Sequence, residues 1–118
     1  MTNYDEYKNN SKYNKLSTNV KDVVEKLDKI LSDKNYLYKG IWRNDEESGG
    51  NVFIFEVERK RERRKNLITL RPQTSFLTVE VYWNKADKHY FDIHTEEDIS
   101  DELLNEISNM YQIVSYNQ

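Results

Sequence analysis

Apolar residues in the first third of the chain recur at the spacing of one face of an α-helix. They occupy Leu16, Val20, Val23, Val24, Leu27, Ile30 and Leu31. Separations of three and four residues bring such positions to one side of a helix, and Ser17, Thr18 and Asn19 are residue types that cap helix N-termini. The pattern predicts a first helix that begins near residue 16 and fades in the segment 32–35.

The middle of the chain alternates between apolar and polar residues in short runs that are separated by turn sequences. Five runs are expected to be strands: YLYKGIW, VFIFEV, NLITL, FLTVEVYW and KHYFDIH. Successive side chains of a strand point to opposite faces of a sheet, so Leu77 and Val79 of the fourth run face away from Glu80. One face of the sheet is therefore expected to be buried, and the other to contact water.

A second amphipathic pattern follows the last expected strand. Its apolar positions are Leu103, Leu104, Ile107, Met110, Tyr111 and Val114. Ser100, Asp101 and Glu102 suit the N-terminus of a helix. The order of the expected elements, a helix, five strands and a second helix, predicts a single α+β domain over residues 16–118. We expect a five-stranded antiparallel meander sheet with an N-terminal and a C-terminal helix packed on one face. Residues 1–15 show no periodicity and are expected to be a flexible N-terminal arm.

Composition narrows the classes of function. The chain has no cysteine, which excludes disulfides, thiolate metal sites and a cysteine nucleophile. No apolar run approaches the ~20 residues of a membrane span, and the first residues lack the apolar block of a signal peptide, so we expect a cytoplasmic protein. Glycine-rich phosphate loops and nucleophile elbows are missing from the sequence. The chain is therefore not expected to be an enzyme, to hold a metal or cofactor, or to take a small-molecule substrate.

Charge is distributed unevenly along a chain whose net charge is −3 at pH 7. Residues 1–43 contain nine basic and six acidic residues, whereas residues 92–118 contain seven acidic residues and no basic one. The densest basic run is RKRERRK, whose basic members are Arg59, Lys60, Arg61, Arg63, Arg64 and Lys65. At the tip of a hairpin this run could contact phosphates, so we expect modest, salt-sensitive binding of DNA or RNA. A purely solubilising and edge-protecting role of the same charges is the alternative.

The expected water-facing side of the sheet indicates a different partner. Strand alternation assigns to it Glu56, Glu58, Glu80, Tyr82, Tyr90 and Asp92. Acidic side chains repel phosphate, so nucleic acid should be confined to the basic hairpin and neighbouring lysines. An acidic surface that carries tyrosines is instead suited to a protein partner. The alternative function is therefore a protein-interaction or inhibitor domain, including one of mobile-element origin, that docks on a nucleic-acid enzyme or another protein.

The segment NKADKHYFDIHTEEDISDELLNEISNMYQIV resembles the closing part of the MmcQ/YjbR-like family. That part of the family has an Asn-Lys turn, a strand that opens with His and an aromatic residue, an acidic loop, and a helix with a Tyr and an aliphatic pair near its end. The matching residues are Asn84, Lys85, His89, Tyr90, Asp98, Leu103, Leu104, Ile107, Tyr111, Ile113 and Val114. Tyr90 stands where the family usually has tryptophan, and Met110 where it has serine. The resemblance covers the C-terminal half and implies a double-wing-like, DNA-binding fold by analogy.

Overall fold

The computed structural model describes residues 3–4, 6–43, 52–57 and 65–115. Its elements are β1 (Asn3–Tyr4), η1 (Glu6–Asn9), α1 (Ser11–Asn14), α2 (Thr18–Asp33), β2 (Tyr38–Arg43), β3 (Val52–Val57), β4 (Lys65–Pro72), β5 (Leu77–Asn84), β6 (Asp87–Ile93), η3 (Glu96–Asp98) and α3 (Asp101–Ser115). Among these described residues, no helix has the length and apolar character needed to cross a membrane.

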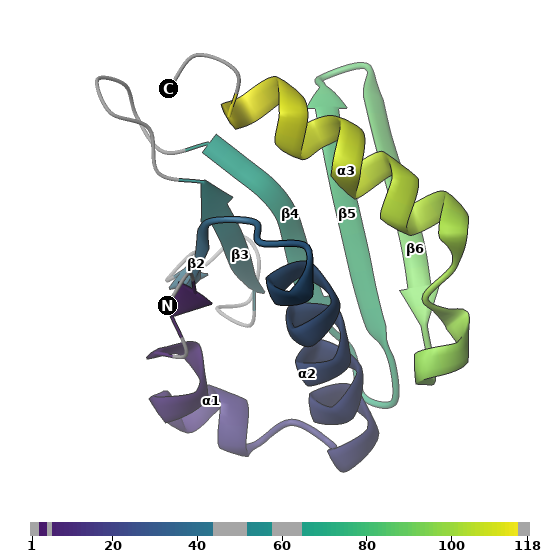
Figure 1. Cartoon of the computed structure of the whole chain (residues 1–118). Coiled ribbons are helices and arrows are strands. Elements are labelled where there is room, and N and C mark those ends of the chain that lie inside the picture. Colours follow the sequence, from purple (N-terminus) through teal and green to yellow (C-terminus); the bar gives the residue numbers. More distant parts are fainter. Residues whose placement is uncertain (1–2, 5, 44–51, 58–64, 116–118) are drawn as a thin grey trace.

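The strands form one sheet in which they lie in chain order from β1 to β6 (Figure 1). Each strand from β2 to β6 pairs antiparallel with its neighbour, and α2 and α3 cover the same face (Figure 1). The prediction of a five-stranded antiparallel meander with two helices on one face is therefore confirmed. In addition, β1 pairs parallel with β2 over two residues, which leaves β6 as the opposite edge of the sheet.

The core lies between the sheet and the two helices. Three side chains that β5 turns toward the helices are 0% exposed, and so are six on the inner faces of α2 and α3. These residues are Leu77, Val79, Val81, Val20, Val24, Leu27, Leu31, Leu103 and Ile107. Full burial of one such side chain contributes about 1.5–3 kcal/mol relative to leaving it in water. The apolar spacing that predicts the two helices thus also marks the residues that hold them on the sheet.

The expectation of a flexible arm is wrong for residues 6–15. η1 and α1 bring Tyr7 and Tyr13 into the core, where they are 1% and 4% exposed. The Tyr7 hydroxyl donates a hydrogen bond to Asp28 Oδ2 at 2.6 Å, and the Tyr13 hydroxyl donates one to Glu25. Both carboxylates belong to α2. Because hydrogen bonds to a charged acceptor are stronger than neutral ones, the two tyrosines attach this segment firmly to the helix.

Candidate functional site

The basic run follows the two central strands of the sheet. β3 and β4 pair antiparallel, and Val57 at the end of β3 lies opposite Lys65 at the start of β4. Residues 58–64 therefore connect two paired strand ends. The predicted phosphate-binding residues that lie outside the described part of the chain are Arg59, Lys60, Arg61, Arg63, Arg64 and the side chain of Lys65. Their contact with phosphates stays a prediction.

A β-bulge lies at the base of this connection. The pairing of β3 with β4 shifts by one residue between Phe55 and Glu56, which makes Leu67 the extra residue of β4. Leu67 and its neighbour Ile68 are both buried, at 1% exposed. A bulge bends its strand and increases the local twist. The bulge therefore sets the direction of the end of β4 that adjoins the connection. Burial of Leu67 and Ile68 holds the bulge in place.

The sheet face away from the helices is less acidic than expected. Glu80 is only 5% exposed, and the Arg71 guanidinium binds its Oε1 through Nε at 2.9 Å and Nη2 at 2.8 Å. The expectation that Glu80 contacts water is therefore wrong, because strand alternation gives the face of a side chain but not the neighbours that cover it. Asp92 is exposed and Glu56 is half-buried, while Glu58 lies outside the described residues.

Two tyrosines on this face remain exposed. Tyr82 on β5 is 42% exposed, and Tyr90 on β6 is 56% exposed. Tyr82 pairs with Lys88, which stands two residues before Tyr90, so the two rings are diagonal neighbours across the strands. The Lys88 ammonium lies 5.5 Å from the centroid of the Tyr82 ring, within range of a cation–π interaction. The predicted protein-binding surface is thus reduced mainly to a tyrosine pair beside Asp92, at the free edge of the sheet.

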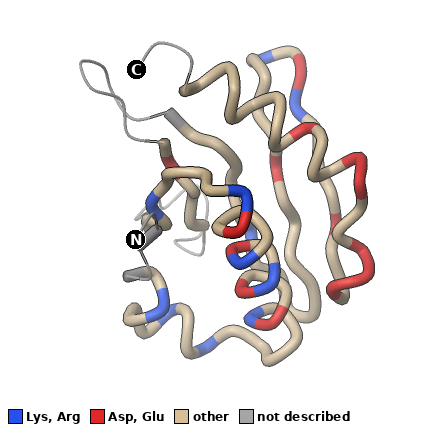
Figure 2. Tube along the Cα trace, in the orientation of Figure 1, with Lys and Arg blue, Asp and Glu red and all other residues tan. Residues whose placement is uncertain are grey.

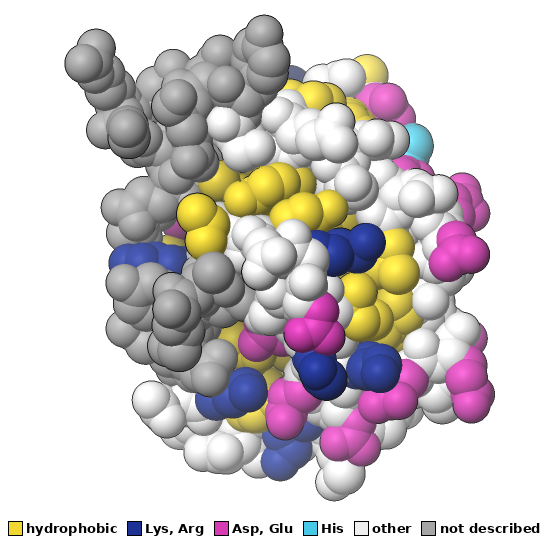
Figure 3. Space-filling model, in the orientation of Figure 1, with side chains coloured by type: hydrophobic (Ala, Val, Ile, Leu, Met, Phe, Trp, Pro, Cys, Tyr) yellow, Lys and Arg dark blue, Asp and Glu magenta, His cyan; other side chains and the backbone are white. Residues whose placement is uncertain are grey.

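An acidic surface that the sequence reasoning did not assign covers η3 and the first turn of α3. It consists of five exposed carboxylates (Figures 2 and 3): Glu96, Glu97, Asp98, Asp101 and Glu102. Backbone N–H groups of His94 and Thr95 donate to Asp98 Oδ2 and hold the pKa of that carboxyl below its usual value. The sequence signal was the absence of basic residues after residue 91. The negative charge of this surface is unfavourable for the approach of phosphate groups.

The carboxylate of Glu106 joins α3 to the last two strands. Its Oε1 accepts a hydrogen bond from Trp83 Nε1 at 3.0 Å and lies 2.7 Å from His89 Nδ1, while His89 Nε2 lies 2.9 Å from Asp87 Oδ1. The hydrogen bond to Glu106, aided by the charge of Asp87, raises the pKa of His89 above its usual value. The imidazolium is therefore favoured here as a link between α3 and the sheet. Among the described residues, no three His, Asp or Glu side chains are grouped as metal ligands.

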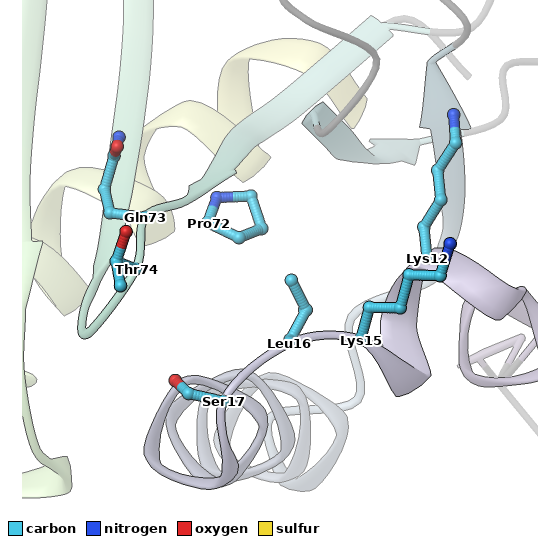
Figure 4. Close-up of a pocket in the computed structure, with 7 residues that line it drawn as sticks. All are labelled: Lys12, Lys15, Leu16, Ser17, Pro72, Gln73 and Thr74. Carbon is cyan, nitrogen blue, oxygen red and sulfur yellow. The ribbon is translucent and has the colours of Figure 1, made fainter.

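An open groove of about 760 Å³ lies between the α1–α2 link and the β4–β5 turn (Figure 4). Its described lining residues are Lys12, Lys15, Leu16, Ser17, Pro72, Gln73 and Thr74. The two lysines come from the α1 side, and Gln73 and Thr74 from the opposite side (Figure 4). Strands rise by about 3.3 Å per residue, so the length of β4 separates this groove from the backbone of Lys65, at the other end of the strand, by ~23 Å.

Comparisons of the chain with protein-family models, with curated proteins and with solved structures find no match. The resemblance of residues 84–114 to the MmcQ/YjbR-like family accordingly stays a prediction. Any assignment of function has to come from the chemistry of this chain's own residues.

Proposed function

We propose that the chain is a non-enzymatic domain that binds DNA or RNA through the connection between β3 and β4. The proposal rests on the register of these strands. With Val57 opposite Lys65, five basic residues fall within residues 58–64, which join two paired strand ends, and Lys65 itself is the sixth. A link this short between paired strand ends supports the proposal, because we expect its residues to stay near one another and their positive charge to be concentrated. Phosphate groups would bind to such a concentration of charge with release of counterions.

The charges of the described residues support an approach of nucleic acid from one side. The exposed carboxylates of η3 and α3 lie beyond β6 and would repel a phosphate backbone (Figure 2). Basic side chains near the opposite edge of the sheet come from η1, from α1 and its C-cap, and from β2, namely Lys8, Lys12, Lys15 and Lys39. A polyanion would therefore be steered away from the C-terminal side and toward the strands that carry the basic connection.

The expected affinity is modest and depends on salt. Each phosphate that a basic side chain neutralises contributes a slope of about −0.9 to log affinity against log salt concentration for duplex DNA. Binding through the connection should therefore give a slope no steeper than about −5, with six basic residues available. A steeper slope would require contacts from the lysines of η1 and α1 as well.

The test compares two triple variants with the same change in net charge. Arg61→Glu/Arg63→Glu/Arg64→Glu reverses the connection, and Lys26→Glu/Lys29→Glu/Lys34→Glu reverses lysines of α2 and its C-cap. Fluorescence anisotropy with duplex DNA, single strands and RNA across a salt series measures the affinity. We expect the arginine variant to lose binding at low salt and the lysine variant to retain most of it. Unchanged binding by the arginine variant, or an equal loss in both variants, would contradict the proposal.

A second candidate function is a protein-interaction or inhibitor domain, including one of mobile-element origin that blocks a nucleic-acid enzyme. The exposed rings of Tyr82 and Tyr90, with Asp92 beside them, favour this candidate. Co-purification from the host distinguishes the two functions. A partner protein that is retained by the wild-type chain and lost from the variant Tyr82→Ser/Tyr90→Ser supports the second candidate. Recovery of the chain without any retained protein opposes it. Both candidates imply a cytoplasmic location.

A further inference from the structure

The free edge of the sheet is β6. Within the described part of the chain, β6 pairs with β5 alone, whereas the opposite edge carries the two-residue β1. Exposed side chains cover the four positions from Asp87 to Tyr90 and also Asp92. An edge strand presents backbone N–H and C=O groups that no neighbouring strand uses. The seven residues of β6 therefore offer a template on which another strand can pair.

We propose that β6 pairs antiparallel with β6 of a second copy of this chain, centred on Tyr90, so that two sheets join into one two-fold symmetric dimer. A two-fold interface uses the same surface on both copies, so each contact occurs twice. This inference goes beyond the proposed nucleic-acid function and does not depend on it.

The charges on β6 fit this pairing in one register. When Tyr90 lies opposite its counterpart, Lys88 of each copy lies opposite Asp92 of the other. All three side chains share the face away from the helices, because they are two residues apart along the strand. Opposite charges that face each other across antiparallel strands attract, and like charges repel. A register shifted by two residues loses both ion pairs, so charge selects the arrangement centred on Tyr90.

The exposed tyrosine and the charges beyond the strand agree with the same arrangement. Tyr90 is 56% exposed in the single chain, and in the dimer its ring would meet its counterpart as a cross-strand aromatic pair. The two-fold axis also brings the β5–β6 turn, with exposed Lys85, toward η3 of the other copy, where Glu96 and Glu97 are exposed. Each copy therefore has a lysine-bearing end and an acidic end along one edge, and antiparallel pairing brings unlike ends together.

The expected dimer is weak and reversible. Two paired strands of seven residues cover less surface than the ~1,600 Å² of a standard protein interface. Dimerisation should therefore depend on protein concentration and weaken as salt screens the two ion pairs.

Two single charge reversals and their mixture test the proposal. Analytical ultracentrifugation should show the wild-type chain passing from monomer to dimer between about 10 µM and about 1 mM. Lys88→Asp and Asp92→Lys each place two like-charge pairs across the interface and should weaken the dimer at least about tenfold. An equimolar mixture of the two variants should restore it, because copies that are acidic at both positions then face copies that are basic at both. Lys34→Asp changes the net charge as Lys88→Asp does, but on exposed surface outside β6, and should dimerise as the wild type does.

Any of three results would overturn the inference. The wild-type chain could stay monomeric at about 1 mM, neither charge reversal could weaken the dimer, or the mixture of folded variants could stay monomeric. Thermal melting by circular dichroism verifies that each variant is folded. The measurements contain no nucleic acid, and Arg61→Glu/Arg63→Glu/Arg64→Glu should dimerise as the wild type does. Failure of the dimer and failure of nucleic-acid binding are therefore separate outcomes.

Discussion

Removal of Tyr7 should destabilise the whole fold, although this residue comes from a segment whose sequence resembles a polar arm. Its ring stacks on Phe53 with centroids 5.5 Å apart and meets Tyr13 edge-on at the same distance. Its hydroxyl donates to Asp28, which also accepts a hydrogen bond from the Tyr38 hydroxyl. Two variants separate these contributions: Tyr7→Phe removes the hydroxyl alone, and Tyr7→Ala removes the ring as well.

The structure gives a different magnitude for each variant. Tyr7→Phe leaves the buried carboxylate of Asp28 with one donor fewer, a loss of about 1–3 kcal/mol. Tyr7→Ala also empties a site that is 1% exposed, and truncation of a buried aromatic ring costs about 3–5 kcal/mol. Domains of this size unfold with only about 5–15 kcal/mol. With a urea m-value of about 2 kcal/mol per molar, Tyr7→Ala should lower the urea midpoint by roughly 2 M.

Urea unfolding followed by circular dichroism measures these differences, and Asn9→Ala is the matched control. Asn9 is exposed within the same short helix, so its truncation should change the free energy of unfolding by less than about 0.5 kcal/mol. Trypsin should cut after Lys12 and Lys15 faster in Tyr7→Ala than in the wild type, because the segment is released from the core. If Tyr7→Ala unfolds within about 0.5 kcal/mol of the wild type, the segment is not part of the folded core and the reasoning is refuted.

Three further predictions concern the same core and the link to α3. In Gly40→Ala the new Cβ would lie 2.5 Å from Tyr7 Cδ1, so urea unfolding should show a loss of about 1–3 kcal/mol that shrinks in the Tyr7→Ala background. Burial raises the pKa of Tyr7 and Tyr13 far above 10. The stability that their neutral form provides is therefore complete below pH 10 and is lost at higher pH. Between about pH 8 and 11 the urea midpoint should fall less steeply in Tyr7→Phe than in the wild type. Because the pKa of His89 is raised, its contribution to stability is present below about pH 6.5 and is lost as pH rises through the folded value. NMR titration of its ring should give a midpoint that Glu106→Gln lowers.

The long helices and strands could be predicted from the sequence because many successive apolar and polar positions in each of them follow the same period. α2 and α3 begin and end close to the expected residues, and the inward residues Leu77, Val79 and Val81 of β5 are fully buried as alternation requires. Local pattern is sufficient here because a helix or strand with one apolar face has a single way to cover it. Short turns between successive strands then left the meander as the simplest topology.

The N-terminal segment could not be predicted in this way, because its buried residues are tyrosines in a polar sequence and show no period. The clue was elsewhere, in Asp28, which follows Val24 and Leu27 on the apolar face of α2 and is 6% exposed. A carboxylate at such a position needs donors. Tyr7 and Tyr38 supply them, from 21 and 10 residues away. Glu80 is a similar case, since its face was predicted correctly but the covering guanidinium of Arg71 was not.

Charge is the property of the candidate site that the sequence predicts best, and the topology explains why. In a meander the order of strands repeats the order of the chain, so segments that are close in sequence stay close in space. Uneven charge along the sequence becomes uneven charge across the molecule, with carboxylates gathered beyond β6 (Figure 2). A crossover topology would bring distant segments side by side and mix their charges. The same segregation means that nucleic acid at the β3–β4 connection and a second copy at β6 would use different parts of the sheet and would not compete.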